Sequence, residues 1–192
     1  MQLSQSETYK NLARAYASEC QARTRYEFAE YGARYNGLTA LSQIIDKIAY
    51  QEFNHARMLY TFIQDASKEN IENISISAGF PFKEKWDVEE NLKLMAEDEA
   101  QEAKIYAKFE KIAEKEGFKE IAKLFADIRA VEKSHEKIFR ALYNQMRDGT
   151  MYKREKPVTW ECGACGYKAT QNEAWEECPL CKAKRGVVLL KI

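Results

Sequence analysis

Apolar residues recur at helical spacing along the first 147 residues of the chain. From about Ser4 to Tyr35 there is no Pro and a single Gly, and the apolar positions lie three to four residues apart, which predicts a long amphipathic helix. Asn36-Gly37 is a helix-stop signal. A second helix is expected from Leu38 to about Ala66, with an apolar face made of Leu41, Ile44, Ile45, Ile48, Leu59 and Phe62.

The pattern changes between Asn70 and Trp86, where β-branched residues, a Gly and a Pro predict a long ordered loop. Asp87 is a candidate N-cap for a third helix, which we expect to run through Glu116 and to end at Gly117. A fourth helix is expected from Phe118 to about Arg147. Its inner face would contain Ile121, Leu124, Phe125, Ile128, Phe139 and Leu142.

Two helical hairpins with tight Gly turns, joined by a long connection, predict a mostly α fold, namely a ferritin-like four-helix bundle with a crossover link. Each helix of about 30 residues would be roughly 45 Å long. We expect the bundle to occupy residues 1–147 and a polar linker to occupy 148–156. Residues 157–192 would form a small metal-binding domain with short β-strands.

The two halves of the bundle region repeat one another with a shift of 80 residues. The members of the repeat are Glu19, Tyr26, Gly37, Glu52 and His55, which recur as Glu99, Tyr106, Gly117, Glu132 and His135. Both histidines of the chain belong to it, and each follows a Glu by three residues. The repeat therefore duplicates chemistry as well as packing.

Residues three apart on a helix share a face, so each Glu-x-x-His pair can point into the bundle. With Glu19 and Glu99 from the other two helices, this is the ligand pattern of ferritin-like di-iron and di-manganese carboxylate proteins. A single helical Glu is usually solvated, and a single His on an apolar face is usually a core residue. Six such residues in one repeated register favour a two-metal site, since unpaired buried carboxylates are costly.

Three neighbouring residues each have two interpretations, and a fourth is expected to have a packing role. Glu102, whose counterpart is Ala22, is either a seventh ligand or an exposed charge. Tyr26 and Tyr106 are either core aromatics or phenols that hydrogen-bond to the metal site. Cys20 is expected to be a small packing residue that is turned away from the face of Glu19.

The C-terminal segment carries two Cys-x-x-Cys pairs, Cys162 with Cys165 and Cys178 with Cys181, separated by twelve residues. This spacing predicts a tetrahedral four-sulfur site, which suits either zinc or a single iron. Trp160, Tyr167 and Trp175 would form a small core around it. So short a segment would derive much of its folding energy from the metal.

The composition of the chain argues against several classes of partner and location. Lys plus Arg and Asp plus Glu both number 30, so nothing indicates a nucleic-acid or anionic-membrane partner. No apolar run is long enough to cross a membrane, and the first residues lack a signal-peptide profile. Cysteines in metal-binding pairs indicate a reducing compartment, and we expect the cytoplasm.

The chain resembles the rubrerythrin family over nearly its whole length. The resemblance is carried by Glu19-Cys-Gln-Ala-Arg with Tyr26, Glu52-x-x-His55, Glu99-x-x-Glu102, Glu116-Gly-Phe118, Glu132-x-x-His135 and the rubredoxin-like Cys-x-x-Cys-Gly-Tyr…Cys-Pro-x-Cys tail. It implies a non-haem di-iron peroxidase of oxygen-sensitive microbes that reduces hydrogen peroxide to water. Electrons would come from an NAD(P)H-linked reductase or a rubredoxin through an Fe(Cys)4 centre.

The resemblance also implies residue roles. Glu19, Glu52, His55, Glu99, Glu102, Glu132 and His135 would hold two irons, and Cys162, Cys165, Cys178 and Cys181 would hold the third. Glu52 and Glu132 would bridge the pair, and one iron would exchange Glu102 for His55 between redox states. Family members are commonly dimers in which one subunit's rubredoxin domain faces the other's di-iron site.

This sequence departs from the family pattern at three places. Cys20 stands where the family often has Ser, and Lys182 stands where it usually has Gly. The carboxylates of the third helix lie seven and four residues before Tyr106, whereas the family usually has them eight and five before. Strict alignment would select Asp98 and Gln101, whereas the internal repeat selects Glu99.

Two other functions use the same residues. A ferritin-like iron oxidase or iron store would need the bundle but not an attached electron carrier. A non-enzymatic metal-binding protein would carry zinc on the four cysteines. An oxygenase is less favoured, since the sequence has no evident substrate-cavity signature.

Overall fold

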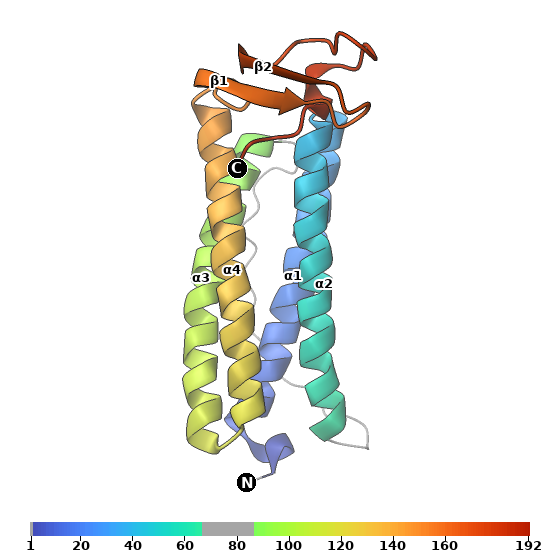
Figure 1. Ribbon diagram of the computed structural model, residues 1–192. Helices are drawn as coiled ribbons and strands as arrows, with labels where there is room; N and C mark the ends of the chain where they lie inside the picture. The colour runs from blue at the N-terminus through green and yellow to red at the C-terminus, as the bar shows by residue number, and fades with distance from the viewer. Residues whose placement is uncertain (1, 67–86) are drawn as a thin grey trace.

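The computed structural model describes residues 2–66 and 87–192, which form a four-helix bundle capped at one end by a small β-structure (Figure 1). The helices are α1 (Glu7–Tyr35), α2 (Thr39–Ala66), α3 (Val88–Glu116) and α4 (Lys119–Arg147). The predicted ferritin-like architecture is confirmed. The loop expected at 70–86 lies outside the described residues.

The first helix begins three residues later than the sequence predicts. Leu3–Gln5 forms a short 3-10 turn, and Ser6 then caps α1 by accepting a hydrogen bond from the backbone N–H of Tyr9 at 3.0 Å. A Ser side chain satisfies an N–H that has no partner within the helix, so the helix starts after it. Asp87 caps α3 in the same way, through the N–H of Glu90.

The repeated glycines end α1 and α3 with the same hydrogen-bonded turn. Gly37 and Gly117 have φ of +74° and +89°, in the left-handed region that favours glycine. The N–H of the next residue, Leu38 or Phe118, donates to the carbonyl five residues back at 2.9 Å. These bonds satisfy carbonyls at the helix ends and reverse the chain.

The helices run in two antiparallel pairs, α1 with α2 and α3 with α4 (Figure 1). α2 ends far from the β-structure and α3 begins near it, as a crossover connection requires. The buried apolar side chains form two clusters, one around Tyr26, Ile45 and Phe139 and one around Leu12, Tyr106 and Phe125. None of the described helices has a stretch apolar and long enough to cross a membrane.

The C-terminal part consists of an antiparallel pair, β1 (Lys153–Glu161) and β2 (Lys168–Glu173), and the 3-10 turn η2 (Arg185–Val187). Trp160, Trp175 and two of the cysteines form its buried core, with Tyr167 packed against it. The domain boundaries at 147 and 157 stay predictions; β1 begins at Lys153, inside the expected linker.

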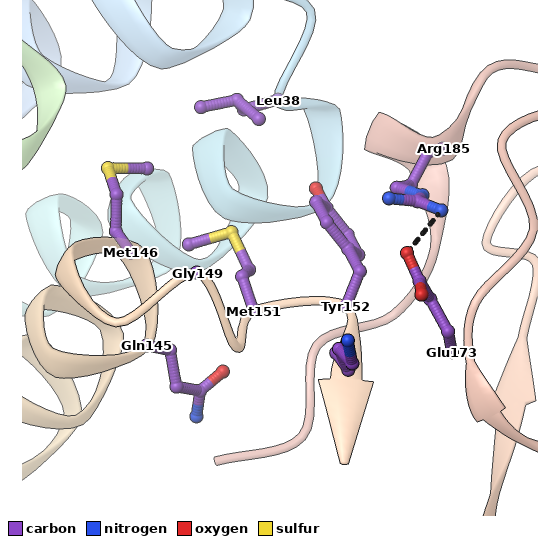
Figure 2. A pocket seen from close by; sticks show the side chains of 9 residues that line it. Leu38, Gln145, Met146, Gly149, Met151, Tyr152, Glu173 and Arg185 are labelled. Atoms are coloured by element: carbon purple, nitrogen blue, oxygen red, sulfur yellow. Dashed lines mark hydrogen bonds and ion pairs between the residues drawn. The ribbon is translucent and has the colours of Figure 1, made fainter.

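This C-terminal part docks on the α1–α2 turn. Gly186 in η2 approaches so closely that an added Cβ would lie 1.7 Å from the carbonyl oxygen of Gly37. Beside this contact lies a cavity of about 220 Å³. Tyr152 lines it, and its side chain lies between those of Met151 and Arg185 (Figure 2). Arg185 pairs with Glu173 at 3.1 Å and so ties η2 to β2.

We predict that Gly186→Ala weakens this docking. The added methyl group meets backbone atoms, which cannot rotate away, and overpacking of this kind costs about 1–3 kcal/mol. Thermal unfolding with limited proteolysis between the two parts would measure it, with the exposed neighbour Lys184→Ala as the control. Unchanged unfolding of Gly186→Ala would contradict the contact.

A second prediction concerns Glu116, at the end of α3. Its carboxylate accepts hydrogen bonds from the N–H groups of Glu7 and Thr8 and from the Thr8 hydroxyl, at 2.5–3.1 Å. Burial opposes ionisation, but these bonds outweigh it and lower the pKa of Glu116. The folded pKa is therefore below the unfolded one, so the stabilisation is present above the unfolded pKa and is lost as pH falls through the folded one.

Glu116→Gln should accordingly lower the free energy of unfolding at pH 7 by up to about 1 kcal/mol, because it removes a charged cap at the start of α1. The difference from the parent protein should shrink below about pH 4. Chemical denaturation at several pH values measures both effects. A difference that stays constant with pH would contradict a role for the ionised carboxylate.

Candidate metal centres

A buried polar layer separates the two apolar clusters of the bundle. Each helix contributes to it, and none of the contributing residues is more than 5% exposed. The layer contains Glu19 on α1, Glu52 and His55 on α2, Glu99 and Glu102 on α3, and Glu132 and His135 on α4. All seven carboxylate and imidazole residues that the sequence selected therefore lie inside the bundle.

Glu52 and Glu132 each reach both histidines. One oxygen of Glu52 lies 2.9 Å from Nδ1 of His55, and its other oxygen lies 2.9 Å from Nδ1 of His135. The two oxygens of Glu132 lie 3.0 Å from the same two nitrogens. This arrangement would suit two carboxylates that bridge neighbouring ions, each with one imidazole.

Glu19 and Glu99 complete two groups related by the internal repeat. Glu19 lies 3.4 Å from Nδ1 of His55, and Glu99 lies 3.6 Å from Nδ1 of His135. Within each group, Glu19–Glu52–His55–Glu132 or Glu52–Glu99–Glu132–His135, the potential ligand atoms lie within 4.8 Å of one another. We refer to these groups as the His55 subsite and the His135 subsite.

Two buried tyrosines cross between the halves of the bundle. The hydroxyl of Tyr26 on α1 donates to Glu99 on α3 at 2.7 Å, and that of Tyr106 on α3 donates to Glu19 on α1. Both rings also pack in the apolar clusters, so each tyrosine has both of the roles considered from the sequence. Through this crossed pairing, each half of the bundle holds a carboxylate of the other half, Glu99 or Glu19.

Glu102 lies in the same layer but outside both subsites. Its carboxylate accepts a hydrogen bond from the hydroxyl of Ser18, and its other oxygen has no partner among the described residues. Asp98 instead pairs with Arg25, and Gln101 is exposed. The register of the internal repeat, and not strict family alignment, therefore identifies the α3 carboxylate that reaches the histidines.

Burial and hydrogen bonding shift the pKa values of these carboxylates in different directions. Burial raises the pKa of Glu19, Glu99 and Glu102 well above the usual range. Burial also opposes ionisation of Glu52, but its contacts with His135 and His55 prevail and lower its pKa to about 2. Glu52 differs because it touches both imidazoles, whereas Glu19 and Glu99 each approach only one.

The histidines respond in the opposite sense. Burial lowers the pKa of His135, but the carboxylates of Glu132, Glu52 and Glu99 outweigh it and raise the pKa to about 12. The same balance raises the pKa of His55. The layer thus carries a negative potential that attracts cations, whether protons or metal ions.

The donor set fits two divalent cations. Among the described residues, each Nδ1 is hydrogen-bonded to the Glu three residues before it, so one buried oxygen each of Glu19, Glu52 and Glu132 only lies near an imidazole that is already paired, and one of Glu99 has no partner. Such groups are costly in a protein interior unless they bind something positive. Four carboxylates and two imidazoles match the charge and ligand preference of two iron ions.

The four cysteines converge in the C-terminal part as their spacing predicts. Sγ of Cys162 lies 3.8 Å from that of Cys181, and Sγ of Cys165 lies 3.7 Å from that of Cys178. Four sulfurs about 2.3 Å from one tetrahedral ion would be separated by about 3.8 Å. Burial disfavours the Cys178 thiolate, but N–H groups of Cys181 and Leu180 outweigh it and lower the pKa of Cys178 to about 7.

Comparison with known proteins agrees with this pairing of sites. The family model described as rubrerythrin matches residues 10–143. The chain is 36% identical to the rubrerythrin of Clostridium perfringens over 177 residues, which cover 92% of this chain and 90% of that protein. It is likewise 36% identical to the rubrerythrin of Nitratidesulfovibrio vulgaris, with the same coverage. The chain belongs to the rubrerythrin family.

Solved structures support the same fold. Partially reduced nigerythrin matches with a TM-score of 0.63 and 23% identity, over 96% of this chain and 86% of that one. The bacterioferritin of Desulfovibrio desulfuricans matches with a TM-score of 0.65 and 19% identity, over 75% of this chain and 82% of that one. Membership in the rubrerythrin family indicates an oxidoreductase, and the two donor sets fit its cofactors: a di-iron centre and one iron on four cysteines.

Two polar neighbours of the candidate di-iron centre were not predicted from the sequence. Ser18 holds Glu102, and Gln51 on α2 has its amide oxygen 2.9 Å from Nε2 of His135. Their counterparts in the repeat are Asp98 and Val131, so both positions break the internal symmetry. A break in the repeat next to a repeated ligand position is the signal that would have found them.

Lys182 has a backbone conformation that favours glycine, the residue that the family resemblance leads us to expect at this position. Its φ is +63°, matching the +75° of Gly166 after the other cysteine pair. Each residue donates its N–H to the carbonyl of the first cysteine of its pair, at 3.0 Å for Lys182 and 2.8 Å for Gly166. The two knuckles are thus equivalent, and Lys182 adopts a strained conformation to complete one of them.

We predict that Lys182→Gly stabilises the C-terminal part by up to about 1 kcal/mol, because glycine tolerates positive φ. The matched change, Gly166→Ala, should destabilise it by a similar amount. Thermal unfolding, and the rate at which a chelator removes the metal, would report both effects. Faster metal loss from Lys182→Gly than from the parent protein would contradict the prediction.

Proposed function

We propose that this protein is a non-haem di-iron peroxidase that reduces hydrogen peroxide to water, with electrons passed through an iron on Cys162, Cys165, Cys178 and Cys181. One observation carries the proposal: two adjacent subsites share Glu52 and Glu132 in a buried layer, on the same chain as a four-thiolate site. A centre that only stores iron has no need of the second site.

We assign Glu19, Glu52, His55, Glu99, Glu132 and His135 as ligands of the di-iron centre. Four carboxylates would balance the charge of two divalent ions. Glu102 is a further candidate that Ser18 holds beside the centre, on the side where the family pattern expects a carboxylate to exchange with His55. When bound, a ferrous pair supplies two electrons and a two-metal clamp for both oxygens of the peroxide.

The protein itself would supply protons to the reaction and exclude bulk water from the centre. Burial raises the pKa of Tyr26 and Tyr106, and their contacts with Glu99 and Glu19 raise it further, so each phenol retains its proton. That proton lies in a hydrogen bond to a ligand carboxylate, where it can be relayed as the O–O bond breaks. The two apolar clusters exclude bulk water from the layer.

Delivery of electrons favours more than one subunit. Glu19 lies sixteen residues before the end of α1, a helical rise of roughly 24 Å, and the cysteine domain sits beyond that end. A partner's cysteine domain beside this layer would shorten the path, so we propose a homodimer or higher homo-oligomer. A rubredoxin or an NAD(P)H-linked reductase in the cytoplasm would refill the cysteine-bound iron.

A ferritin-like iron oxidase is the second candidate, because the fold is also that of bacterioferritin. It would assemble into a large shell, react with oxygen in preference to peroxide, and gain nothing from the cysteine domain. Zinc on the cysteines would make the domain structural. An absorption spectrum distinguishes the metals, since oxidised Fe(Cys)4 is red and the zinc form is colourless.

We predict that stopped-flow mixing of the fully reduced protein with hydrogen peroxide reoxidises the di-iron centre faster than oxygen at equal concentration does. Cys178→Ser should abolish turnover with an electron donor but preserve this single reoxidation, because only the refilling step uses the cysteines. Cys20→Ser, which changes a cysteine outside the cluster, serves as the control for both measurements. Slow reoxidation by peroxide, or a faster reaction with oxygen, would contradict the peroxidase assignment.

A further inference from the structure

A groove of about 440 Å³ runs between α2 and α4 and reaches the edge of the polar layer. Its walls are mainly apolar and include Ile48, Val131 and Ile138, and the chain end, through Leu189, Leu190 and Ile192, closes one side. His135 and Gln51 are among its few polar lining residues. The outer edge of one histidine of the layer thus faces this groove, where Gln51 contacts it.

The orientation of His135 assigns the proton in this contact. Nδ1 faces Glu52, Glu99 and Glu132, so a metal ion in the His135 subsite would take the Nδ1 lone pair. A neutral imidazole then has its proton on Nε2. Nε2 therefore donates to the amide oxygen of Gln51, 2.9 Å away, and the bond holds both the tautomer and the ring orientation.

The His55 subsite lacks this brace. The repeat places Val131 where Gln51 stands, and a valine side chain cannot accept a hydrogen bond. Among residues 2–66 and 87–192, none is found bonded to Nε2 of His55, whose Nδ1 contacts the carboxylates as that of His135 does. Two subsites with nearly identical ligands thus differ in what fixes their imidazoles.

We propose that Gln51 is a positioning residue that locks His135 as a permanent ligand and makes the two metal subsites unequal. The proposal rests on the ligand assignment of the proposed function. Its chemical content is one N–H···O bond that is present at the His135 subsite and has no counterpart at the His55 subsite among the residues that the structure describes. Removing such an outer partner commonly weakens metal binding by about 10–100-fold.

The test uses the full chain loaded with zinc in all three sites and labelled with ¹⁵N at histidine. The chain has only two histidines, so the ring N–H signals are few, and a His55→Asn variant assigns them. We expect the Nε2 proton of His135 to exchange with solvent more slowly than that of His55. In Gln51→Leu, this protection should disappear, and competition with a chelator should show one of the two bundle ions held about 10–100-fold more weakly.

Two variants separate a hydrogen bond from a general packing effect. Gln51→Glu keeps an acceptor and should retain both the slow exchange and the tight ion. Gln43→Leu makes the same change at another glutamine of the groove, for which no side-chain hydrogen bond to a subsite residue is found in the described part of the chain, and should behave as the parent protein. If Gln51→Leu does not fold, Gln51→Ala replaces it in the test, and loss of slow exchange of the His135 Nε2 proton in that variant gives the same information.

The outcomes distinguish the two proposals. Equal exchange of the two histidine protons in the parent protein, or equal weakening of both ions in Gln51→Leu, would overturn the role of Gln51. Unchanged affinity in that variant would do the same. Fewer than two ions bound by the parent bundle would instead contradict the ligand assignment itself.

Discussion

The bundle is organised around the cost of burying negative charge. Five carboxylates with little or no exposure occupy one layer, and two imidazoles contact four of them. An interior of this kind is tolerated only if cations enter it, as protons or as metal ions. The raised pKa of Glu19 and Glu99 and the partnerless oxygens are two expressions of the same requirement. Metal binding and proton uptake by this layer are therefore competing ways to neutralise it.

Duplication gives this charged layer its geometry. The same helix-ending turn, at Gly37 and Gly117, sets the register of both hairpins, so both Glu-x-x-His pairs meet at one level. The tyrosines then cross between hairpins, each supporting the carboxylate of the other half. Departures from the symmetry lie in the surroundings, at Ser18 and Gln51, while the repeated donors keep their register. A duplicated scaffold can in this way hold two similar ions in unlike environments.

The fold and the main donors could be predicted because they depend on local rules. Helical periodicity, Gly stops and Cys-x-x-Cys spacing each act over a few residues, and the 80-residue repeat extended them to contacts between helices. A break in the repeat marks the position of Ser18, but its bond to Glu102 could not be predicted, because the bond depends on how α1 and α3 are rotated against each other. The docking of Gly186 on Gly37 depends likewise on contact between parts distant in sequence. The helix start at Glu7 was missed because the Ser6 cap competes with a pattern that continues through it.

The two equivalent turns have unequal neighbours. The hairpins of the bundle point in opposite directions, so the turn at Gly37 lies beneath the cysteine domain and the turn at Gly117 lies at the far end (Figure 1). An added Cβ would meet nothing within 4 Å at either glycine, but the carbonyl of Gly37 is covered by the backbone of Gly186. Extra residues inserted at the second turn would lie at the end of the bundle away from the cysteine domain. The same insertion at the first turn would displace that domain from its contact with Gly37, so the two copies differ in how freely they can lengthen.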